Sequence, residues 1–272
     1  MGPEEYCSRK VAPPGSDLYY ALLFLPEEQR AAIEALHAFQ AEVREVIEEC
    51  TDPGVARLKL QWWREESGRI ARGEAHQPVA RALQAVHERH SLRHGVLGQI
   101  IDTAERGLDE PPGASPDGLI ERQRAIGARV WRLCAETCGI CGAGTLQAVD
   151  HLGAALGEGA LLRNLRTMLR RPGLEPVAAR TAATAGGPRL EERIPGLRRD
   201  IASAQDAIPR HDRLGLLGAI TLARIEMATL EEVERDGCRV LDRHVTLTPL
   251  RKLWIARRTR AAERRRSRRA DA

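Results

Sequence analysis

Apolar residues recur along this chain at the three- and four-residue spacing of amphipathic helices, interrupted by short clusters of Pro, Gly and polar residues. The stretch 36–50 shows the pattern well. Its apolar stripe consists of Leu36, Phe39, Val43, Val46 and Ile47. No alternating strand pattern of useful length occurs anywhere. The sequence therefore predicts an all-α protein.

Pro, Gly and helix-capping residues give the approximate helix boundaries, such as Ser16 as an N-cap and Pro53 as a first helical residue. The expected helices cover residues 5–11, 16–25, 26–50, 53–73, 78–90, 92–109, 115–138, 145–171, 189–207, 211–236 and 248–257. Residues 172–196 contain Pro, Gly and Thr-Ala runs and predict a long loop or lid. Because no repeat or linker divides the chain, we expect one domain over 1–256.

Charge is concentrated at the C-terminal end. Eight arginines in 257–272 stand against Glu263 and Asp271, so this segment carries +6 and the remaining body −2 within the net +4. The body therefore does not point to a nucleic-acid partner. We expect 257–272 to be a disordered, Arg-rich tail, which anionic lipid could attract to the inner membrane.

Six cysteines without a secretory signal peptide indicate reduced thiols, and no twenty-residue apolar span occurs. These features predict a cytoplasmic protein. Cys134, Cys138 and Cys141 have the spacing of one type of iron–sulfur site, but a helical pattern surrounds them, so we expect three buried thiols. His87, His90 and His94 are expected to be exposed.

Candidate chemistry is concentrated in 36–50, where charged residues crowd two helical turns beside the apolar stripe. They are Glu42, Arg44, Glu45, Glu48 and Glu49. Taken alone, this helix is a candidate acidic site.

Short strings spread over nearly the whole chain match one known family in order and spacing. They include Tyr19-Tyr20 with Phe24-Leu25-Pro26, Leu36-His37-Ala38-Phe39, Asp52-Pro53-Gly54-Val55-Ala56-Arg57 with Trp62-Trp63, Leu152-Gly153, and Leu247-Thr248-Pro249-Leu250-Arg251-Lys252-Leu253. Together they resemble bacterial squalene/phytoene synthases, especially presqualene diphosphate synthase-like proteins. The resemblance implies an all-α isoprenoid synthase bundle around a central cavity, in which two Asp-rich helices hold Mg²⁺ against prenyl diphosphates.

The first Asp-rich motif of that family is degraded here. Family members carry Cys-Arg and then Asp-x-x-x-Asp after Ala-Phe, and the corresponding positions are Gln40, Ala41, Arg44 and Glu48. Arg44 and Glu48 stand at i and i+4, so we expect them to pair with each other. This pairing would use the one carboxylate left in register.

The second motif is also degraded. The positions corresponding to the family's Gln, Asn, Arg, Asp and second Asp are Gly157, Ala160, Arg163, Asn164 and Met168. Only Arg163 matches. Between Leu161 and Arg171 there are four arginines and no carboxylate. The second of the two helices that would hold Mg²⁺ is therefore basic instead of acidic. We call the two facing acidic helices of the family the metal clamp.

Two ligand sites remain as hypotheses. Glu45, Glu48 and Glu49 could hold Mg²⁺ if the protein is active, although the facing wall is cationic. Without metal, Arg forks could bind a prenyl diphosphate or an acidic lipid directly. The arginines concerned are Arg44, Arg163, Arg166 and Arg170.

The sequence favours a catalytically inactive family member that binds an isoprenoid or lipid, or assists assembly with a protein partner, and needs no cofactor. A mitochondrial assembly factor of respiratory complex I resembles the synthases in the same way and lacks the acidic motifs. The alternative is an active Mg²⁺-dependent head-to-head prenyltransferase, which would condense farnesyl diphosphate to presqualene diphosphate, squalene or a phytoene-like product.

Overall fold

The computed structural model describes residues 1–109, 116–169, 188–240 and 245–268, with the side chains of 116, 166–169 and 188–191 left out. The helices are α1 (Pro3–Val11), α2 (Asp17–Leu22), α3 (Glu27–Glu49), α4 (Pro53–Arg72), α5 (Pro78–His90), α6 (His94–Glu105), α7 (Pro116–Thr137), α8 (Ala143–Leu169), α10 (Pro188–Asp206), α11 (Leu217–Arg235) and α12 (Pro249–Arg268). Short 3₁₀ turns occur at Arg106–Leu108 (η1) and Arg210–Asp212 (η2). Over these ranges the regular structure is helical throughout, which confirms the all-α prediction.

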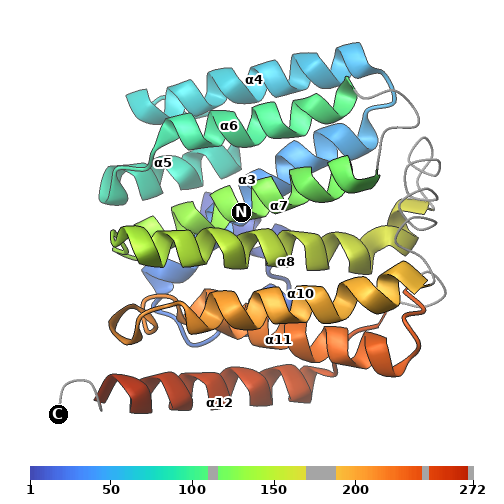
Figure 1. Ribbon diagram of the computed structural model, residues 1–272. Coiled ribbons are helices and arrows are strands. Elements are labelled where there is room, and N and C mark those ends of the chain that lie inside the picture. The colour runs from blue at the N-terminus through green and yellow to red at the C-terminus, as the bar shows by residue number, and fades with distance from the viewer. Residues whose placement is uncertain (110–115, 170–187, 241–244, 269–272) are drawn as a thin grey trace.

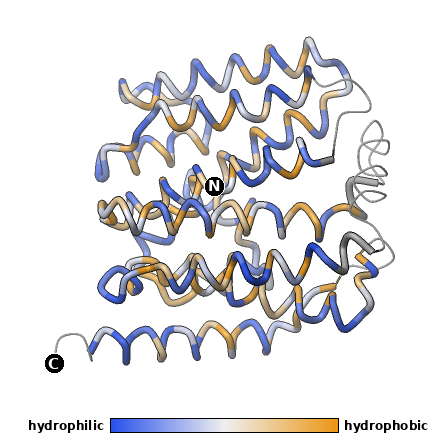
Figure 2. The backbone as a smooth tube through the Cα atoms, in the orientation of Figure 1, coloured by the Kyte–Doolittle hydropathy of each residue, from blue (hydrophilic) through white to orange (hydrophobic). Residues whose placement is uncertain are grey.

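The long helices lie roughly side by side in a stack (Figure 1). It runs from α4 and α6 at one end through α3, α7 and α8 to α10, α11 and α12 at the other. Figure 2 shows hydrophobic and hydrophilic residues alternating along most helices, whereas α12 is mainly hydrophilic. Since α12 is the outermost helix at its end of the stack, it has neighbours on one side only in this view.

Local sequence signals fix the helix ends as expected. The Ser16 hydroxyl accepts a hydrogen bond from the Tyr19 amide at 3.1 Å. Asp52 caps α4 by accepting from the amides of Gly54 and Val55 at 2.6 and 3.1 Å, with Pro53 as the first helical residue.

The core contains many of the apolar residues that the helical pattern selected. Phe39 is fully buried on α3, and its ring meets that of Trp63 edge to face, with centroids 5.5 Å apart. Trp63 is buried and Trp62 is 40% exposed, so the two neighbouring tryptophans point to different environments.

Two glycines of α8 let it approach the backbone of α7. A Cβ added at Gly153 would lie 2.5 Å from the carbonyl oxygen of Gly127, and one at Gly157 would lie 2.3 Å from that of Gln123. Gly157 is the position at which the resemblance expects Gln. Glycine in place of Gln at position 157 therefore allows α7 and α8 to pack closely.

The C-terminal segment differs from the expected disordered tail, because α12 continues to Arg268 instead of ending near Arg257. Its far half is held by Glu263, which is 1% exposed and accepts hydrogen bonds from three arginines. The distances are 2.7 Å from Arg213 Nε, 3.0 Å from Arg224 Nη2 and 3.0 Å from Arg266 Nη1. Sequence reasoning counted Glu263 only as an opposing charge.

Part of the expected loop over 172–196 is also helical. Residues 188–196 form the first turns of α10, in agreement with the helix expected from 189. The remainder of that expectation falls on 170–187, outside the described residues.

Changing Glu263 to Gln is expected to lower the free energy of unfolding by about 2 kcal/mol at neutral pH, because neutral Gln makes weaker hydrogen bonds to the surrounding arginines. Burial alone would raise the pKa of Glu263, but Arg213, Arg266 and Arg224 outweigh it and hold this pKa below its ordinary value. The carboxylate therefore contributes stability above its unfolded-state pKa, and this contribution is lost as the pH falls through the lower folded-state pKa.

Urea unfolding of the wild type and of E263Q over an acidic pH series measures this contribution. The two stabilities should converge as the pH falls. E231Q is the matched control, because Glu231 pairs with Arg235 in an exposed i,i+4 bridge and its loss should cost less than about 0.5 kcal/mol. A difference between wild type and E263Q that stays constant with pH would contradict the assignment.

Candidate functional site

The two candidate motif positions on α3 pair with each other. Arg44 Nε lies 3.7 Å from Glu48 Oε1, and the Arg44 side chain is 49% exposed. The expected i,i+4 pair is therefore confirmed. An exposed pair of this kind adds little stability.

The other acidic residues of α3 face a different environment. Lys10 Nζ of α1 lies 2.6 Å from Glu45 Oε2 and 3.1 Å from Glu42 Oε1, and the Tyr6 hydroxyl donates to Glu42 at 2.9 Å. Burial, and secondarily the hydrogen bond to Glu42, raise the pKa of Tyr6.

A pocket of about 270 Å³ opens beside these residues, between α3, α4 and the N-cap residue of α5. Its lining residues are Glu42, Glu45, Val46, Glu49, Lys59, Trp62, Trp63 and Gln77. Glu45 and Glu49 therefore line this pocket, whereas Glu48 pairs with Arg44.

Of the three candidate metal ligands, Glu48 is thus set apart from Glu45 and Glu49. Across the described ranges, no three His, Cys, Asp or Glu side chains gather closely enough to hold a metal ion. Residues 161–171, where the resemblance places the second acidic motif, contain no carboxylate at all. The residues present do not fit the paired carboxylate walls that Mg²⁺ would need against a diphosphate.

On the second motif helix, Arg163 joins a cluster of charges from four helices. Its Nη1 lies 2.8 Å from Asp17 Oδ2 of α2, and its Nη2 lies 2.6 Å from Glu226 Oε2 of α11. Lys252 of α12 completes the group, with its Nζ 2.7 Å from Asp17 Oδ1 and 3.0 Å from the carbonyl oxygen of Gly15. We call Asp17, Arg163, Glu226 and Lys252 the ion cluster.

The ion cluster is largely removed from water. The side chains are 16% exposed at Asp17, 15% at Arg163, 2% at Glu226 and 6% at Lys252. With two carboxylates and two cations the formal charges balance, which limits the cost of burial. The ion cluster can therefore hold its four helices together without a bound ion.

The two carboxylates of the ion cluster, Asp17 and Glu226, have different surroundings. A Cβ at Gly159 would lie 2.4 Å from Glu226 Oε1, so this glycine leaves the space that the carboxylate occupies. Burial raises the pKa of Glu226, and the charge of Arg163 opposes this shift. Burial also acts to raise the pKa of Asp17, but the charges of Arg163 and Lys252 outweigh it and lower that pKa.

Of the four arginines predicted to bind a diphosphate, the structure describes the side chains of Arg44 and Arg163. Arg163 already donates to two carboxylates, so a diphosphate would have to compete with Asp17 and Glu226 for it. Asn164 is exposed on α8. The side chains of Arg166 and Met168, and the whole of Arg170, lie outside the described residues. Joint binding of a diphosphate by these arginines stays a prediction.

The cysteine expectation was wrong in part. Cys134 is buried, Cys138 is half-buried and Cys141 is exposed, because α7 ends at Thr137 and the last two lie beyond it. Burial raises the pKa of Cys138 to about 11 and that of Cys134 well above its ordinary value. Neither thiol is activated for nucleophilic chemistry.

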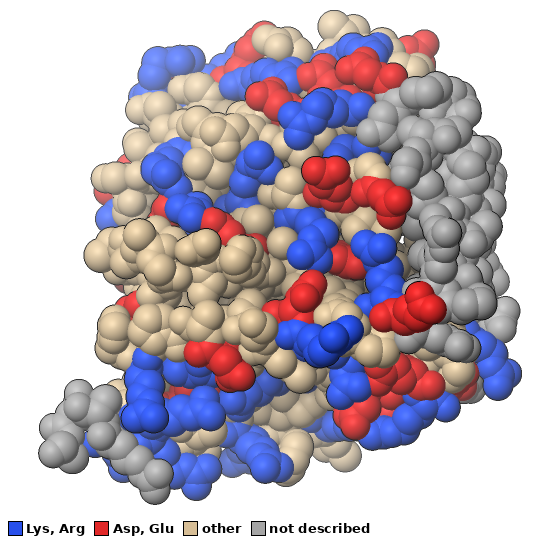
Figure 3. Space-filling model, viewed as in Figure 1, with Lys and Arg blue, Asp and Glu red and all other residues tan. Residues whose placement is uncertain are grey.

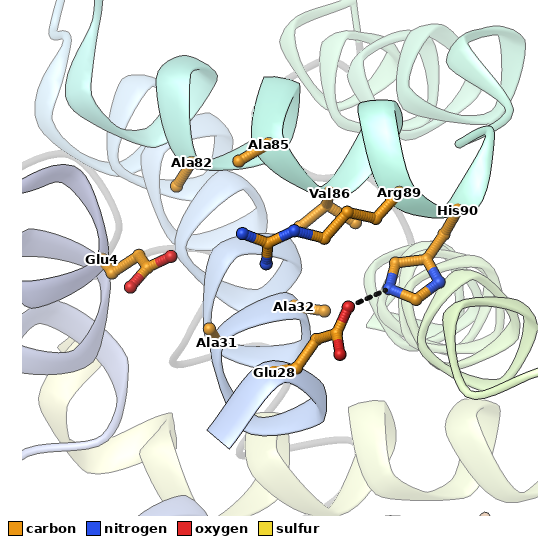
Figure 4. A pocket seen from close by; sticks show the side chains of 9 residues that line it. All are labelled: Glu4, Glu28, Ala31, Ala32, Ala82, Ala85, Val86, Arg89 and His90. Carbon is orange, nitrogen blue, oxygen red and sulfur yellow. Dashed lines mark ion pairs between the residues drawn. The ribbon is translucent and has the colours of Figure 1, made fainter. Parts of the chain in front are cut away.

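His87, His90 and His94 are half-buried, which corrects the expectation that their side chains are exposed. His94 Nε2 and His87 Nδ1 share a hydrogen bond of 2.9 Å. His90 Nε2 lies 3.6 Å from Glu28 Oε1, and Figure 4 shows Glu28 of α3 turned toward it at the edge of a small pocket. With a volume of about 10 Å³, this pocket has room for no more than one water molecule.

Comparisons with known proteins agree with the resemblance seen in the sequence. A family model described as squalene/phytoene synthase matches residues 11–173. Human NADH dehydrogenase (ubiquinone) complex I, assembly factor 6, is 28% identical over 163 residues, which cover 60% of this chain and 49% of that protein. The chain therefore spans about half the length of this relative. Phytoene synthase of Mycobacterium tuberculosis is 25% identical over 258 residues, covering 88% of this chain and 84% of the relative.

Two solved structures share the fold. Squalene synthase HpnC from Alicyclobacillus acidocaldarius superposes with a TM-score of 0.63 at 20% identity, covering 87% of this chain and 94% of its own. A dehydrosqualene synthase in complex with ligand gives a TM-score of 0.69 at 15% identity, covering 96% of each chain.

Proposed function

This chain belongs to the squalene/phytoene synthase family, and we propose that it is a non-catalytic member, which binds an isoprenoid or lipid or assists the assembly of a protein partner. The observation that carries the proposal is the ion cluster, in which the matching arginine of the second motif, Arg163, binds carboxylates of its own chain. In this arrangement Arg163 has a structural role.

The chemistry of prenyl transfer supports the proposal. Ionisation of a prenyl diphosphate requires the leaving diphosphate to be neutralised, and Mg²⁺ held by carboxylates on two facing walls supplies that charge. Here the sequence has no carboxylate between Leu161 and Arg171. Glu45 is paired with Lys10 and Glu48 with Arg44, so the α3 wall also lacks a free pair of ligands in register.

The relatives support two different functions. One is by its name an assembly factor, and its match covers 60% of this chain. The other is by its name a phytoene synthase, and its match covers 88% of this chain. The longer match is the observation that favours the second candidate, an active Mg²⁺-dependent head-to-head prenyltransferase acting on a substrate such as farnesyl diphosphate. The degraded motifs favour the first.

Thermal unfolding with added ligands tests the proposed binding. Farnesyl diphosphate or an anionic lipid should raise the melting temperature by several degrees, since a ligand at a hundred times its Kd adds about 2.7 kcal/mol of stability. The shift should be the same in Mg²⁺ and in EDTA, and E45A/E48A should respond like the wild type. A shift that requires Mg²⁺, or no shift with either ligand and no co-purifying protein, would contradict the proposal.

A further inference from the structure

Eight exposed residues of α12 fall on one stripe. They are Leu250, Trp254, Arg257, Arg258, Ala261, Arg264, Arg265 and Arg268. Their spacings of three and four residues place them along one side of a helix. The stripe begins with two large apolar side chains and continues with arginines, so the outer face of α12 is apolar at one end and strongly basic at the other.

The opposite side of α12 fixes the orientation of this stripe. Ile255, Ala256 and Thr259 are buried against the rest of the protein. Lys252 binds Asp17 at one end of the helix, and Glu263 binds Arg213 further along. Because both ends are anchored by buried ion pairs, the stripe is held outward on a rigid helix.

The apolar end of the stripe is unusually exposed. Leu250 is 79% exposed and Trp254 57% exposed. The Arg258 guanidinium lies over the Trp254 ring, 4.9 Å from its centroid. A tryptophan with a neighbouring cation suits the boundary between lipid headgroups and acyl chains, where the apolar ring and the charge are both accommodated.

A groove of about 610 Å³ runs along the basic part of α12, between this helix and the residues that follow α2. Leu23, Phe24 and Leu253 provide apolar lining, and the arginines that line it are Arg257, Arg260, Arg264, Arg265 and Arg268. Arg260 stacks on the Phe24 ring, 5.0 Å from its centroid. Apolar and guanidinium groups side by side match the phosphate and first acyl carbons of a lipid.

Three arginines of this groove have no acidic partner within the described chain, so their charges are available to a molecule outside it. In the part of the chain that the structure describes, no acidic side chain pairs with Arg257, Arg264 or Arg265, whereas Arg266, which lies off the stripe, pairs with Glu263. Figure 3 shows Lys and Arg side chains gathered along the edge of the molecule where α12 runs. This surface is therefore complementary to a plane of negative charge.

We propose that the outward face of α12 docks on the surface of a bilayer that contains anionic lipid, with Leu250 and Trp254 among the headgroups and the arginines on the lipid phosphates. No helix in the described ranges is long and apolar enough to cross a membrane. The inference goes beyond the proposed function, since a synthase and a non-catalytic relative could both use this surface.

Vesicle flotation with the full chain tests the docking surface. The wild type should float with vesicles of phosphatidylcholine and phosphatidylserine, should float poorly with phosphatidylcholine alone, and should be released by salt. The variant R257Q/R264Q/R265Q should lose about a hundredfold in affinity, because each arginine near an anionic surface contributes about fivefold. W254S should be released from the vesicles at lower salt than the wild type, because it lacks the apolar contact.

A matched variant separates position from net charge. R9Q/R72Q/R81Q removes the same charge from exposed positions on α1, α4 and α5, and it should bind vesicles like the wild type. Circular dichroism and melting temperature should be unchanged in the α12 variant, because its three arginines are exposed and unpaired over the described chain. Equal loss in both triple variants, full binding by the α12 variant, or tighter binding to duplex DNA than to anionic vesicles would overturn the proposal.

Discussion

Replacing Arg163 with Met is expected to lower the free energy of unfolding by about 3 to 5 kcal/mol, because it leaves Glu226 buried without its cation and Asp17 with Lys252 alone. Glu226 Oε1 already has no hydrogen-bond partner in the described chain, so no other donor is in place to replace the arginine. Urea or thermal unfolding measures the loss.

The size of this effect separates a structural role from a ligand-binding role. R132M is the matched control, because Arg132 pairs with Asp150 on α8 in a bridge whose two side chains are each 30% exposed, and its loss should cost about 1 kcal/mol or less. If R163M is as stable as R132M, the ion cluster does not hold α2, α8, α11 and α12 together, and the structural role of Arg163 is wrong.

Replacing Gly157 with Ala is expected to destabilise the protein by about 3 kcal/mol, at the upper end of the usual cost of overpacking. The added methyl group would lie 2.3 Å from the Gln123 carbonyl oxygen and 3.1 Å from its carbon. These are backbone atoms of α7, so relief requires the two helices to separate. The melting temperature should fall by several degrees.

Gly98 provides the control for Gly157. It also lies inside a helix, α6, but a Cβ there would meet nothing within 4 Å. G98A should therefore be neutral or more stable by up to about 1 kcal/mol, owing to the higher helix propensity of Ala. Equal stability of G157A and the wild type would show that α7 and α8 do not depend on this close approach.

The fold could be predicted from local signals. Caps and prolines such as Ser16, Asp52 and Pro53 act through atoms a few residues away, so the sequence alone placed α2 and α4. The fully buried Phe39 was selected by its place on an apolar stripe. These interactions need no knowledge of the tertiary structure.

The site and the C-terminal helix depended on distant partners. Nothing near Asp17 indicates that it meets Arg163 and Lys252, and Glu263 resembled a charge in a basic tail until α12 placed it beside Arg213. One signal could have helped. Glu226 lies on the same buried part of α11 as Ile220, Ala223 and Ile225, and a carboxylate within a buried helix face requires a cationic partner.

The same reasoning explains how the family motif was replaced. A second acidic motif on α8 would need carboxylates exposed to a metal, whereas α8 here contributes Arg163 to internal pairs and Gly153 and Gly157 to contact with α7. Each of these three residues is used by the packing of the chain itself. The helix that would form half of a metal clamp therefore serves to join its neighbours.

Diphosphate release from farnesyl diphosphate in the presence of Mg²⁺ tests the central claim most directly. The purified wild-type protein should release no diphosphate above the rate without protein, and E45A/E48A should give the same result, because the proposed function assigns neither glutamate to a metal clamp. Metal-dependent release by the wild type that is abolished in E45A/E48A would contradict the account and identify the protein as an active prenyltransferase.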